Sequence, residues 1–290
     1  MNVIAKRLLT FLIGVPAVIA LVLFLPFYRH LPLNIVVILF TAVGAIELSM
    51  MLEKKLMNIT KIEAFIIGAL PPAAITLTVS FNLPEWIIRM MIMTGALWIL
   101  MSVIFTRHDK IENAVKRLAG GFFILAYPGF FAYWLVKMSV WENSGAILIF
   151  LLIVMGSDSA AWLSGSLFGA SNRGIIPVSP SKSIAGFAGQ IAGGIIVSIG
   201  AVLIVPGIFY YNAQIASILT LICKALVLGV CTAAASALGD LAESAMKRSC
   251  GVKDSGKLMF GRGGILDSID SIAFASPVYY VLFYLLFFTP

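Results

Sequence analysis

The sequence has few charged residues. Of its 290 residues, 20 are Lys or Arg and 13 are Asp or Glu, so charged residues make up 11% of the chain and hydrophobic residues 61%. A soluble domain carries about 25% charged residues. A chain with so few cannot cover itself with a surface that water tolerates, which excludes a soluble globular protein, and its apolar content excludes a disordered one. An integral membrane protein remains.

Cysteine is scarce as well, and the chain lacks the alternating pattern of a β-barrel. Cys223, Cys231 and Cys250 show no paired spacing, so we expect neither a disulfide framework nor a thiolate metal site. The apolar runs are continuous, which argues against a barrel. The net charge of +7 reflects cations that flank predicted spans, so we expect no nucleic-acid partner. The predicted fold class is an all-α integral membrane protein.

The apolar runs predict about nine transmembrane helices. A span needs roughly 20 apolar residues, and the runs are interrupted at turn signals such as Pro84 and Pro206-Gly207. The nine candidates are 8–28, 33–52, 62–82, 86–105, 118–138, 145–168, 184–208, 214–240 and 268–288.

The basic residues predict which side each connection faces. Sixteen Lys and Arg residues lie before the first span or in every second connection after it, and three (Arg29, Arg89 and Lys137) lie in the others. Because cytoplasmic connections are enriched in Lys and Arg, the N-terminus and the connections 169–183 and 241–267 are predicted to be cytoplasmic.

Some acids lie inside predicted spans, where an ionisable group is costly and usually marks a pathway or a site. Asp158 lies within the sixth span. Glu47 lies in the second span, two helical turns before Lys54. We expect Glu47 to reach the membrane interface or to pair with Lys54.

Two acidic helix faces flank one predicted cytoplasmic connection. The first carries residues spaced i, i+3, i+7 at the end of the eighth span, and the second carries residues spaced i, i+3 at the start of the ninth. The residues are Asp240, Glu243 and Lys247 on the first face, and Asp267 and Asp270 on the second.

The connection between these faces, residues 247–264, holds five cations and five glycines. Glycine lets a backbone approach a ligand closely and offers N–H groups to phosphate oxygens, and cations neutralise phosphate charge. Carboxylates beside such a loop make sense if Mg²⁺ bridges them to phosphates. The alternative is a loop kept basic by topology, with the acids pairing its cations.

A second candidate anion site precedes the seventh span. Ser179 suits a helix N-cap, Pro180 suits the first helical position and Lys182 adds charge, so this helix start is expected to bind an anion. The glycines that follow, including Gly189 and Gly193, are expected to serve close helix packing in the membrane.

Several stretches together resemble the signature of the phosphatidate cytidylyltransferases, or CDP-diacylglycerol synthases. The resemblance is close over roughly residues 150–275. The matching stretches are Asp158-Ser159-Ala160, Ser179-Pro180-x-Lys182-Ser183, Gly239-Asp240-Leu241-x-Glu243-Ser244, Lys253-Asp254-Ser255-Gly256 and Gly261-x-Gly263-Gly264-Ile265-Leu266-Asp267-x-Ile269-Asp270.

The resemblance implies that CTP and phosphatidate give CDP-diacylglycerol and pyrophosphate with Mg²⁺, in a bacterial inner membrane with the active site facing the cytoplasm. It implies N-terminal transmembrane helices over residues 1–140 and a catalytic domain over 141–290, and it leaves a homodimer open. The implied metal ligands are Asp240 and Asp267, the other catalytic residues are Lys247, Arg248, Lys253 and Asp254, and the substrate-binding residues are Asp158, Ser179, Lys182, Ser183, Glu243, Ser244, Arg262, Gly263, Gly264 and Asp270.

The sequence departs from the family pattern in two motifs. Near the end of the chain, Arg262 stands where the pattern has His, and Ser268 stands where it has Arg. In the motif before the seventh span, Ser181 and Ala185 stand where the family tends to have Lys and Glu. We expect Arg262 to maintain the charge of the loop, although it cannot transfer a proton as His can.

Other functions stay open at this point. A CTP-dependent lipid-alcohol kinase would transfer the terminal phosphate and release CDP, and a weakened relative would have a regulatory role. An ion-coupled transporter would spread its acids across the membrane midplane, whereas most of these gather at one boundary.

Overall fold

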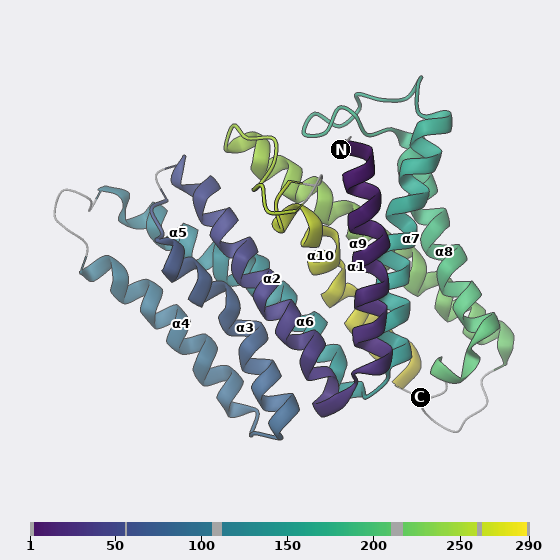
Figure 1. Ribbon diagram of the computed structural model, residues 1–290, viewed down its shortest axis with the longest axis horizontal. Helices are drawn as coiled ribbons and strands as arrows, with labels where there is room; N and C mark the ends of the chain where they lie inside the picture. The colour runs from purple at the N-terminus through teal and green to yellow at the C-terminus, as the bar shows by residue number, and fades with distance from the viewer. Residues whose placement is uncertain (1–2, 56, 106–111, 210–216, 260–262, 289–290) are drawn as a thin grey trace. The chain divides into compact units, whose positions relative to one another are not determined.

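The computed structural model describes residues 3–55, 57–105, 112–209, 217–259 and 263–288, with side chains from Ile13 onward. These residues are almost entirely helical (Figure 1). No strand is assigned among them, and two isolated β-bridges, Arg173 with Ser183 and Met259 with Gly263, close loops. The all-α prediction is confirmed.

Ten α-helices are assigned in the described part of the chain. A π-helical segment, η2 (Leu125–Phe130), joins two of them. The helices are α1 (Val3–Phe24), α2 (Phe27–Glu53), α3 (Lys61–Phe81), α4 (Trp86–Ile104), α5 (Ala114–Ile124), α6 (Phe131–Lys137), α7 (Ser144–Phe168), α8 (Ile184–Ile204), α9 (Ile218–Ser249) and α10 (Leu266–Phe283).

Eight helical segments among the described residues are long and apolar enough to cross a membrane, and α1 lies where the first span is predicted. The prediction of about nine spans is therefore confirmed. The eighth span differs, because α9 continues past its predicted end at residue 240 to Ser249. Residues 241–248 are mostly Ala, Leu, Glu, Met, Lys and Arg, which favour helix, so a change from apolar to polar does not end α9.

The ends of α3 illustrate how local sequence sets a boundary. The Thr60 hydroxyl accepts a hydrogen bond from the Glu63 N–H at 3.2 Å and caps the first turn. Asn82 ends the helix in the left-handed conformation, with a φ of 53°. A capping residue at one end and a left-handed residue at the other define this span.

The chain divides into two compact units. The N-terminal unit contains Met1–Glu142 and Met246–Ile269, and the second unit contains Asn143–Ala245 and Asp270–Pro290. The segment 246–269 belongs with the N-terminal helices because Cys250 and Leu266 are buried in their hydrophobic core. Assignment of catalysis to residues 141–290 stays a prediction.

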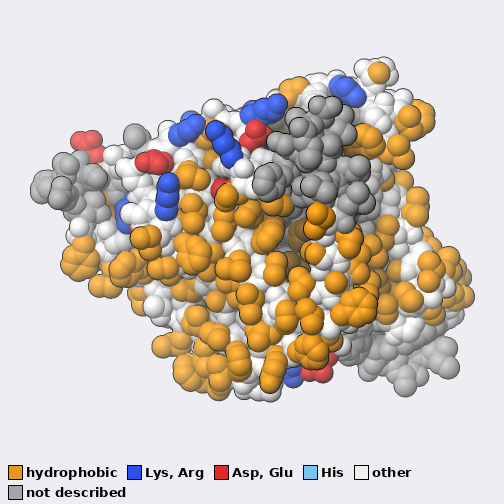
Figure 2. All heavy atoms as spheres, in the orientation of Figure 1, with side chains coloured by type: hydrophobic (Ala, Val, Ile, Leu, Met, Phe, Trp, Pro, Cys, Tyr) orange, Lys and Arg blue, Asp and Glu red, His pale blue; other side chains and the backbone are white. Residues whose placement is uncertain are grey.

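The N-terminal unit has an apolar exterior and a basic end. Its core is formed by buried side chains of α2, α3 and α5 such as Leu48, Ile67 and Ile124. On the face that Figure 2 shows, hydrophobic side chains cover these helices, and Lys and Arg gather toward the end where α2 finishes and α3 begins. The side of the membrane that this end faces stays a prediction from the cation count.

The second unit depends on glycines between its helices. A Cβ on Gly193 of α8 would lie 2.6 Å from the Cβ of Ala160 on α7, and one on Gly194 would lie 2.6 Å from the Cβ of Ala233 on α9. No side chain larger than hydrogen fits at either position without movement. The expectation that these glycines serve close helix packing is confirmed.

We predict that Gly193→Ala lowers the free energy of unfolding by about 1–3 kcal/mol, because the added methyl group overpacks the α7–α8 contact. The matched control is Gly200→Ala in the same helix, where a Cβ would meet nothing within 4 Å. The control is expected to be neutral or stabilising by up to about 1 kcal/mol, since Ala favours helix. Unfolding of both variants in detergent checks this, and equal stability of the two would contradict it.

Candidate active site

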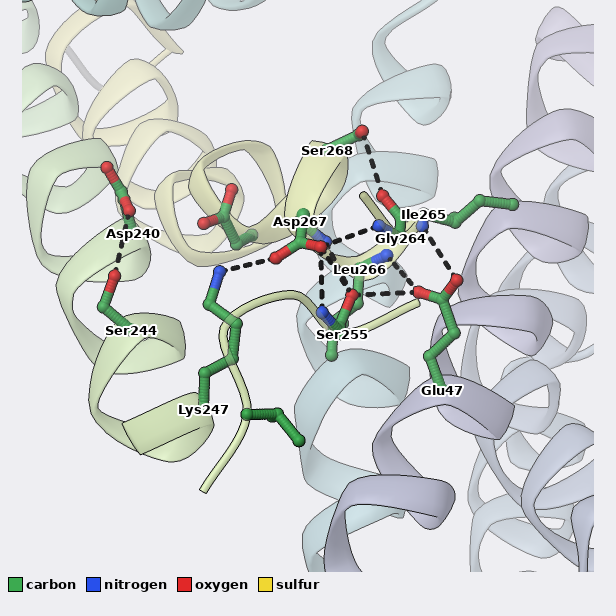
Figure 3. A network of polar contacts seen from close by, with 12 residues as sticks. Glu47, Asp240, Ser244, Lys247, Ser255, Gly264, Ile265, Leu266, Asp267 and Ser268 are labelled. Carbon is green, nitrogen blue, oxygen red and sulfur yellow. Dashed lines mark hydrogen bonds and ion pairs between the residues drawn. The ribbon is translucent and has the colours of Figure 1, made fainter. Parts of the chain in front are cut away.

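Asp267, in the first turn of α10, is held on both edges of its carboxylate (Figure 3). Its Oδ2 accepts hydrogen bonds from the Ser255 N–H at 3.0 Å, the Ser255 hydroxyl at 3.0 Å and the Gly264 N–H at 2.7 Å. Its Oδ1 lies 2.5 Å from Nζ of Lys247 on α9. The side chains of Asp267 and Lys247 are only 7% and 12% exposed, so salt screens their attraction weakly. The structure thus brings together three predicted site residues, Asp267, Lys247 and Gly264.

Glu47, on α2, also belongs to this cluster. Its Oε2 accepts a hydrogen bond from the Leu266 N–H at 2.8 Å, and its Oε1 accepts one from the Ile265 N–H at 3.1 Å. The Ser255 hydroxyl oxygen lies 3.1 Å from Oε2, and its one proton is shared between this oxygen and Oδ2 of Asp267. The expectation that Glu47 reaches the interface or pairs with Lys54 is wrong. Lys54 is exposed, whereas Glu47 is 1% exposed, and two backbone N–H groups with the shared Ser255 hydroxyl replace the water that its carboxylate has lost.

The glycines of the loop leave room for these carboxylates. A Cβ on Gly256 or on Gly264 would overlap the carboxylate of Glu47. Gly263 has a φ of +101°, a conformation that favours glycine. In the structure the N–H groups of residues 264–266 are bonded to protein carboxylates, and the expectation that the loop backbone offers its donors to phosphate oxygens stays a prediction.

The other predicted residues of the loop lie at its surface. Arg248 is exposed, and its Nη1 donates to the Val252 carbonyl at 3.5 Å. Lys253 and Asp254 are exposed as well. Arg262 lies outside the described residues. The exposed charges of this loop are accessible to a ligand from solvent, in contrast to the buried Glu47 and to the Asp267 side chain, which is 7% exposed.

In the second unit, Asp240 on α9 pairs with a lysine from the connection before α8. Its Oδ2 lies 2.5 Å from Nζ of Lys182, and the Ser244 hydroxyl donates to its Oδ1 at 3.5 Å. The Asp240 side chain is 42% exposed, so this pair is more accessible than Asp267 with Lys247. Nζ of Lys182 also lies 5.6 Å from the ring centroid of Phe187, within cation–π distance. Three further predicted residues are thus neighbours.

A polar cluster joins three helices of the second unit. Oδ1 of Asp158 on α7 accepts hydrogen bonds from the Gln190 amide on α8 at 2.8 Å and from the Ser236 hydroxyl on α9 at 3.0 Å. Gln190 and Ser236 are buried. Ser236 lies one helical turn before Asp240 on α9. Asp158 therefore contacts the same face of α9 that carries Asp240.

At the second predicted anion site, α8 starts later in the chain than the sequence predicts. α8 begins after Ser183, whose hydroxyl accepts the N–H of the residue three positions on at 3.0 Å. Ser179 lies in a preceding turn, where its carbonyl accepts the Lys182 N–H at 3.1 Å. The Pro180 carbonyl accepts the Gly174 N–H and closes a loop at the point where the helix was expected. The assignment of Ser179 as N-cap is therefore wrong, and Ser183 has that role.

Glu243 on α9 and Asp270 on α10 are both buried. The Asp270 carboxylate accepts the Ser271 N–H at 2.6 Å. Close to it the two helices pack tightly, since a Cβ on Gly239 would lie 2.8 Å from the Asp270 carbonyl oxygen. That Glu243 and Asp270 contact the substrate stays a prediction.

Two of these carboxylates suit a divalent cation, each considered within its own unit. Asp240 and Asp267 are hard oxygen donors, and each is already paired with a lysine ammonium at 2.5 Å. No three His, Cys, Asp or Glu side chains gather to hold a metal ion in the described part of the chain. Mg²⁺ needs only one or two carboxylates when phosphates and water complete its shell, so the residues present fit it.

Sequence reasoning missed four polar residues of these clusters: Glu47, Gln190, Ser236 and Ser255. A signal exists for Glu47 and Gln190, because a carboxylate or amide deep inside an apolar run needs a partner. Ser255 lies in the matching stretch Lys253-Asp254-Ser255-Gly256, which was a signal for it. Ser236 carries no such signal, because serine is common at helix contacts.

Fold and site together define a class: a helical membrane protein with two carboxylate–lysine pairs and a glycine-rich loop, an arrangement suited to phosphate chemistry. Comparison with known proteins identifies the family. The sequence matches the cytidylyltransferase family over residues 5–286. The chain belongs to this family of enzymes, as its motifs predict.

Individual relatives cover most of the chain. It is 31% identical over 283 residues to phosphatidate cytidylyltransferase of Bacillus subtilis (strain 168), which covers 96% of each chain. It is 33% identical over 217 residues to phosphatidate cytidylyltransferase of Pseudomonas aeruginosa, covering 72% of this chain and 74% of that protein. The uncharacterised protein YnbB of Escherichia coli (strain K12) is 32% identical over 172 residues, which is 58% of this chain and 53% of YnbB.

We predict that Gln190→Leu and Ser236→Ala each lower the free energy of unfolding by about 0.5–1.5 kcal/mol, and that the double variant loses less than the sum. The reason is that the Gln190 amide also donates to the Ser236 hydroxyl at 3.4 Å, so each single variant already removes this contact. Unfolding of the four proteins in detergent measures the coupling. The control pairs Gln190→Leu with Ser198→Ala, whose buried hydroxyl bonds within its own helix. Strict additivity of Gln190→Leu with Ser236→Ala would contradict a direct contact between the two side chains.

Proposed function

We propose that this enzyme transfers the cytidylyl group of CTP to phosphatidate. The observation that carries the proposal is the pair of carboxylate–lysine contacts, Asp267 with Lys247 and Asp240 with Lys182, in a membrane chain of the cytidylyltransferase family. Relatives named phosphatidate cytidylyltransferase that cover nearly the whole chain support the choice of lipid substrate.

The reaction is a displacement at phosphorus. An oxygen of the phosphatidate phosphate forms a bond to the α-phosphorus of CTP, and the bond from that phosphorus to the oxygen bridging to the β-phosphorus breaks. The products are CDP-diacylglycerol and pyrophosphate. Such a step needs positioning and neutralisation of charge more than a strong side-chain base, so the lack of a His in this loop is tolerable.

The lysines supply part of this neutralisation. Lys182 and Lys247 each hold an ammonium against a carboxylate, and each can turn that ammonium to a phosphate oxygen. Arg248 and Lys253, exposed beside the loop, can hold the leaving pyrophosphate or the lipid phosphate. Asp254 is proposed to support phosphate binding in the N-terminal unit, and Ser183 and Glu243 are proposed to do so in the second unit.

Asp240 and Asp267 are the proposed ligands of Mg²⁺. When bound, the ion supplies charge neutralisation at the phosphate oxygens. Ser255 and Gly264 orient Asp267 by three hydrogen bonds to its Oδ2, and Ser244 donates to Asp240. Oriented carboxylates of this kind keep their place when the lysines turn to phosphate.

The proposed location is a bacterial inner membrane with the active site at its cytoplasmic boundary. The support is the count of sixteen cations against three, which puts the connections with Lys182 and Lys247 on the cytoplasmic side. CTP is soluble and phosphatidate lies in the membrane, so a site at this boundary gives both substrates access.

Purified protein with labelled CTP, phosphatidate and Mg²⁺ is expected to release pyrophosphate and to form a labelled lipid. Release of CDP with a phosphorylated lipid alcohol would instead support the kinase and overturn the proposal. Chelation of the metal is expected to stop the reaction, and turnover that continues without divalent cation would overturn the metal assignment.

Asp267→Asn and Asp240→Asn are each expected to lower kcat by about 100-fold or more, because loss of one charge-stabilising group costs about 10²–10³ in rate. Glu142→Gln is the control, since Glu142 pairs with Arg29 at an exposed position away from the loop and is expected to keep full activity. Activity of Asp267→Asn equal to that of the control would contradict the assigned role.

A further inference from the structure

The N-terminus of α10 already has an anion, and that anion is a side chain. A helix start carries unpaired N–H groups and the positive end of the helix dipole, so it attracts negative charge. The N–H groups of Ile265 and Leu266 donate to Glu47, and the Asp267 N–H donates to the Ser255 hydroxyl at 3.3 Å. Glu47 thus occupies the position that a phosphate would take at another helix.

Glu47 is connected to Asp267 through a single hydroxyl. Oγ of Ser255 lies 3.1 Å from Oε2 of Glu47 and 3.0 Å from Oδ2 of Asp267. The same serine donates its N–H to Asp267. The loop that carries Ser255 and the helix start that carries Asp267 are therefore tied to one carboxylate on α2, more than 200 residues earlier in the chain.

The spacing of the loop is built around Glu47. A Cβ on Gly256 would overlap its Oε1, and a Cβ on Gly264 would overlap its Oε2. The segments of the loop that contain Gly256 and Gly264 thus approach this carboxylate so closely that only glycine fits.

We propose that Glu47 is a positioning residue for the reacting groups, a role that rests on the proposed function. It fixes Ser255 and residues 264–266, and these fix Oδ2 of Asp267. The carboxylate of Asp267 is then held with its Oδ1 toward Lys247, and this is the edge that serves the reaction. Glu47 touches no substrate and acts through Ser255 and the loop backbone.

The test uses Glu47→Gln, which keeps the volume but presents an NH₂ group to N–H donors. The expected result is a kcat about 10- to 100-fold lower, as for other groups that orient a metal ligand. The Mg²⁺ concentration for half-maximal activity is expected to rise, and the KM for phosphatidate to stay within about twofold. Glu47→Asp, which keeps the charge on a shorter arm, is expected to recover part of the loss.

The matched control is Glu63→Gln. Glu63 is also a buried carboxylate of the N-terminal unit, but it pairs with Arg117 at 2.8 Å and not with the loop. Loss of activity in both variants in proportion to loss of folded protein would mean that Glu47 is only structural, and this would overturn the proposal. Wild-type kcat and Mg²⁺ dependence in folded Glu47→Gln would overturn it too.

Hydrogen exchange of the amides of Ile265 and Leu266 tests the positioning without any assay of turnover. In Glu47→Gln these amides are expected to exchange at least about tenfold faster than in wild type, and in Glu63→Gln at the wild-type rate. Unchanged exchange in Glu47→Gln would overturn the proposal. If wild type made no CDP-diacylglycerol, the proposed function would fail, and this exchange would still decide whether Glu47 holds the loop.

Discussion

A carboxylate buried in an apolar helical bundle is stable only where protein donors replace the water that it has lost, and much of the loop follows from this constraint. Glu47 and Asp267 share the Ser255 hydroxyl and receive the N–H groups of residues 264–266. The close approach of Gly256 and Gly264 and the position of the first turn of α10 are the geometric consequences. Removal of one carboxylate would leave donors buried without acceptors, which costs more than the bond itself contributes.

The two carboxylate–lysine pairs differ in their exposure to solvent, and this has a consequence for the proposed chemistry. Asp240 with Lys182 is partly open, whereas Asp267 with Lys247 is shielded. In the proposed chemistry, the lysine of such a pair would bind a phosphate oxygen and the carboxylate would hold the cation, so that the local charge would stay balanced. Fixed hydrogen bonds to Oδ2 of Asp267 limit the reorganisation that this exchange requires.

The sequence predicts the class of fold and much of the site, because both depend on local patterns. Apolar runs identify the spans, and motif spacing identifies Asp240, Lys247 and Asp267. It does not predict the partner of Glu47, since the contact joins α2 to a loop more than 200 residues later and no local period encodes it. The start of α8 was predicted too early in the chain for a related reason. Ser179 and Pro180 form a good capping pattern, but the Pro180 carbonyl accepts the Gly174 N–H in a loop, which no local pattern indicates.

Transfer of oxygen-18 tests the central claim most directly. Phosphatidate labelled in its phosphate oxygens, incubated with CTP and the purified enzyme, is predicted to give CDP-diacylglycerol with label in the oxygen that bridges the two phosphorus atoms, and unlabelled pyrophosphate. This result requires attack of the lipid phosphate on the α-phosphorus of CTP. Label in the pyrophosphate, or a product without label in the bridge, would contradict cytidylyl transfer by this chain.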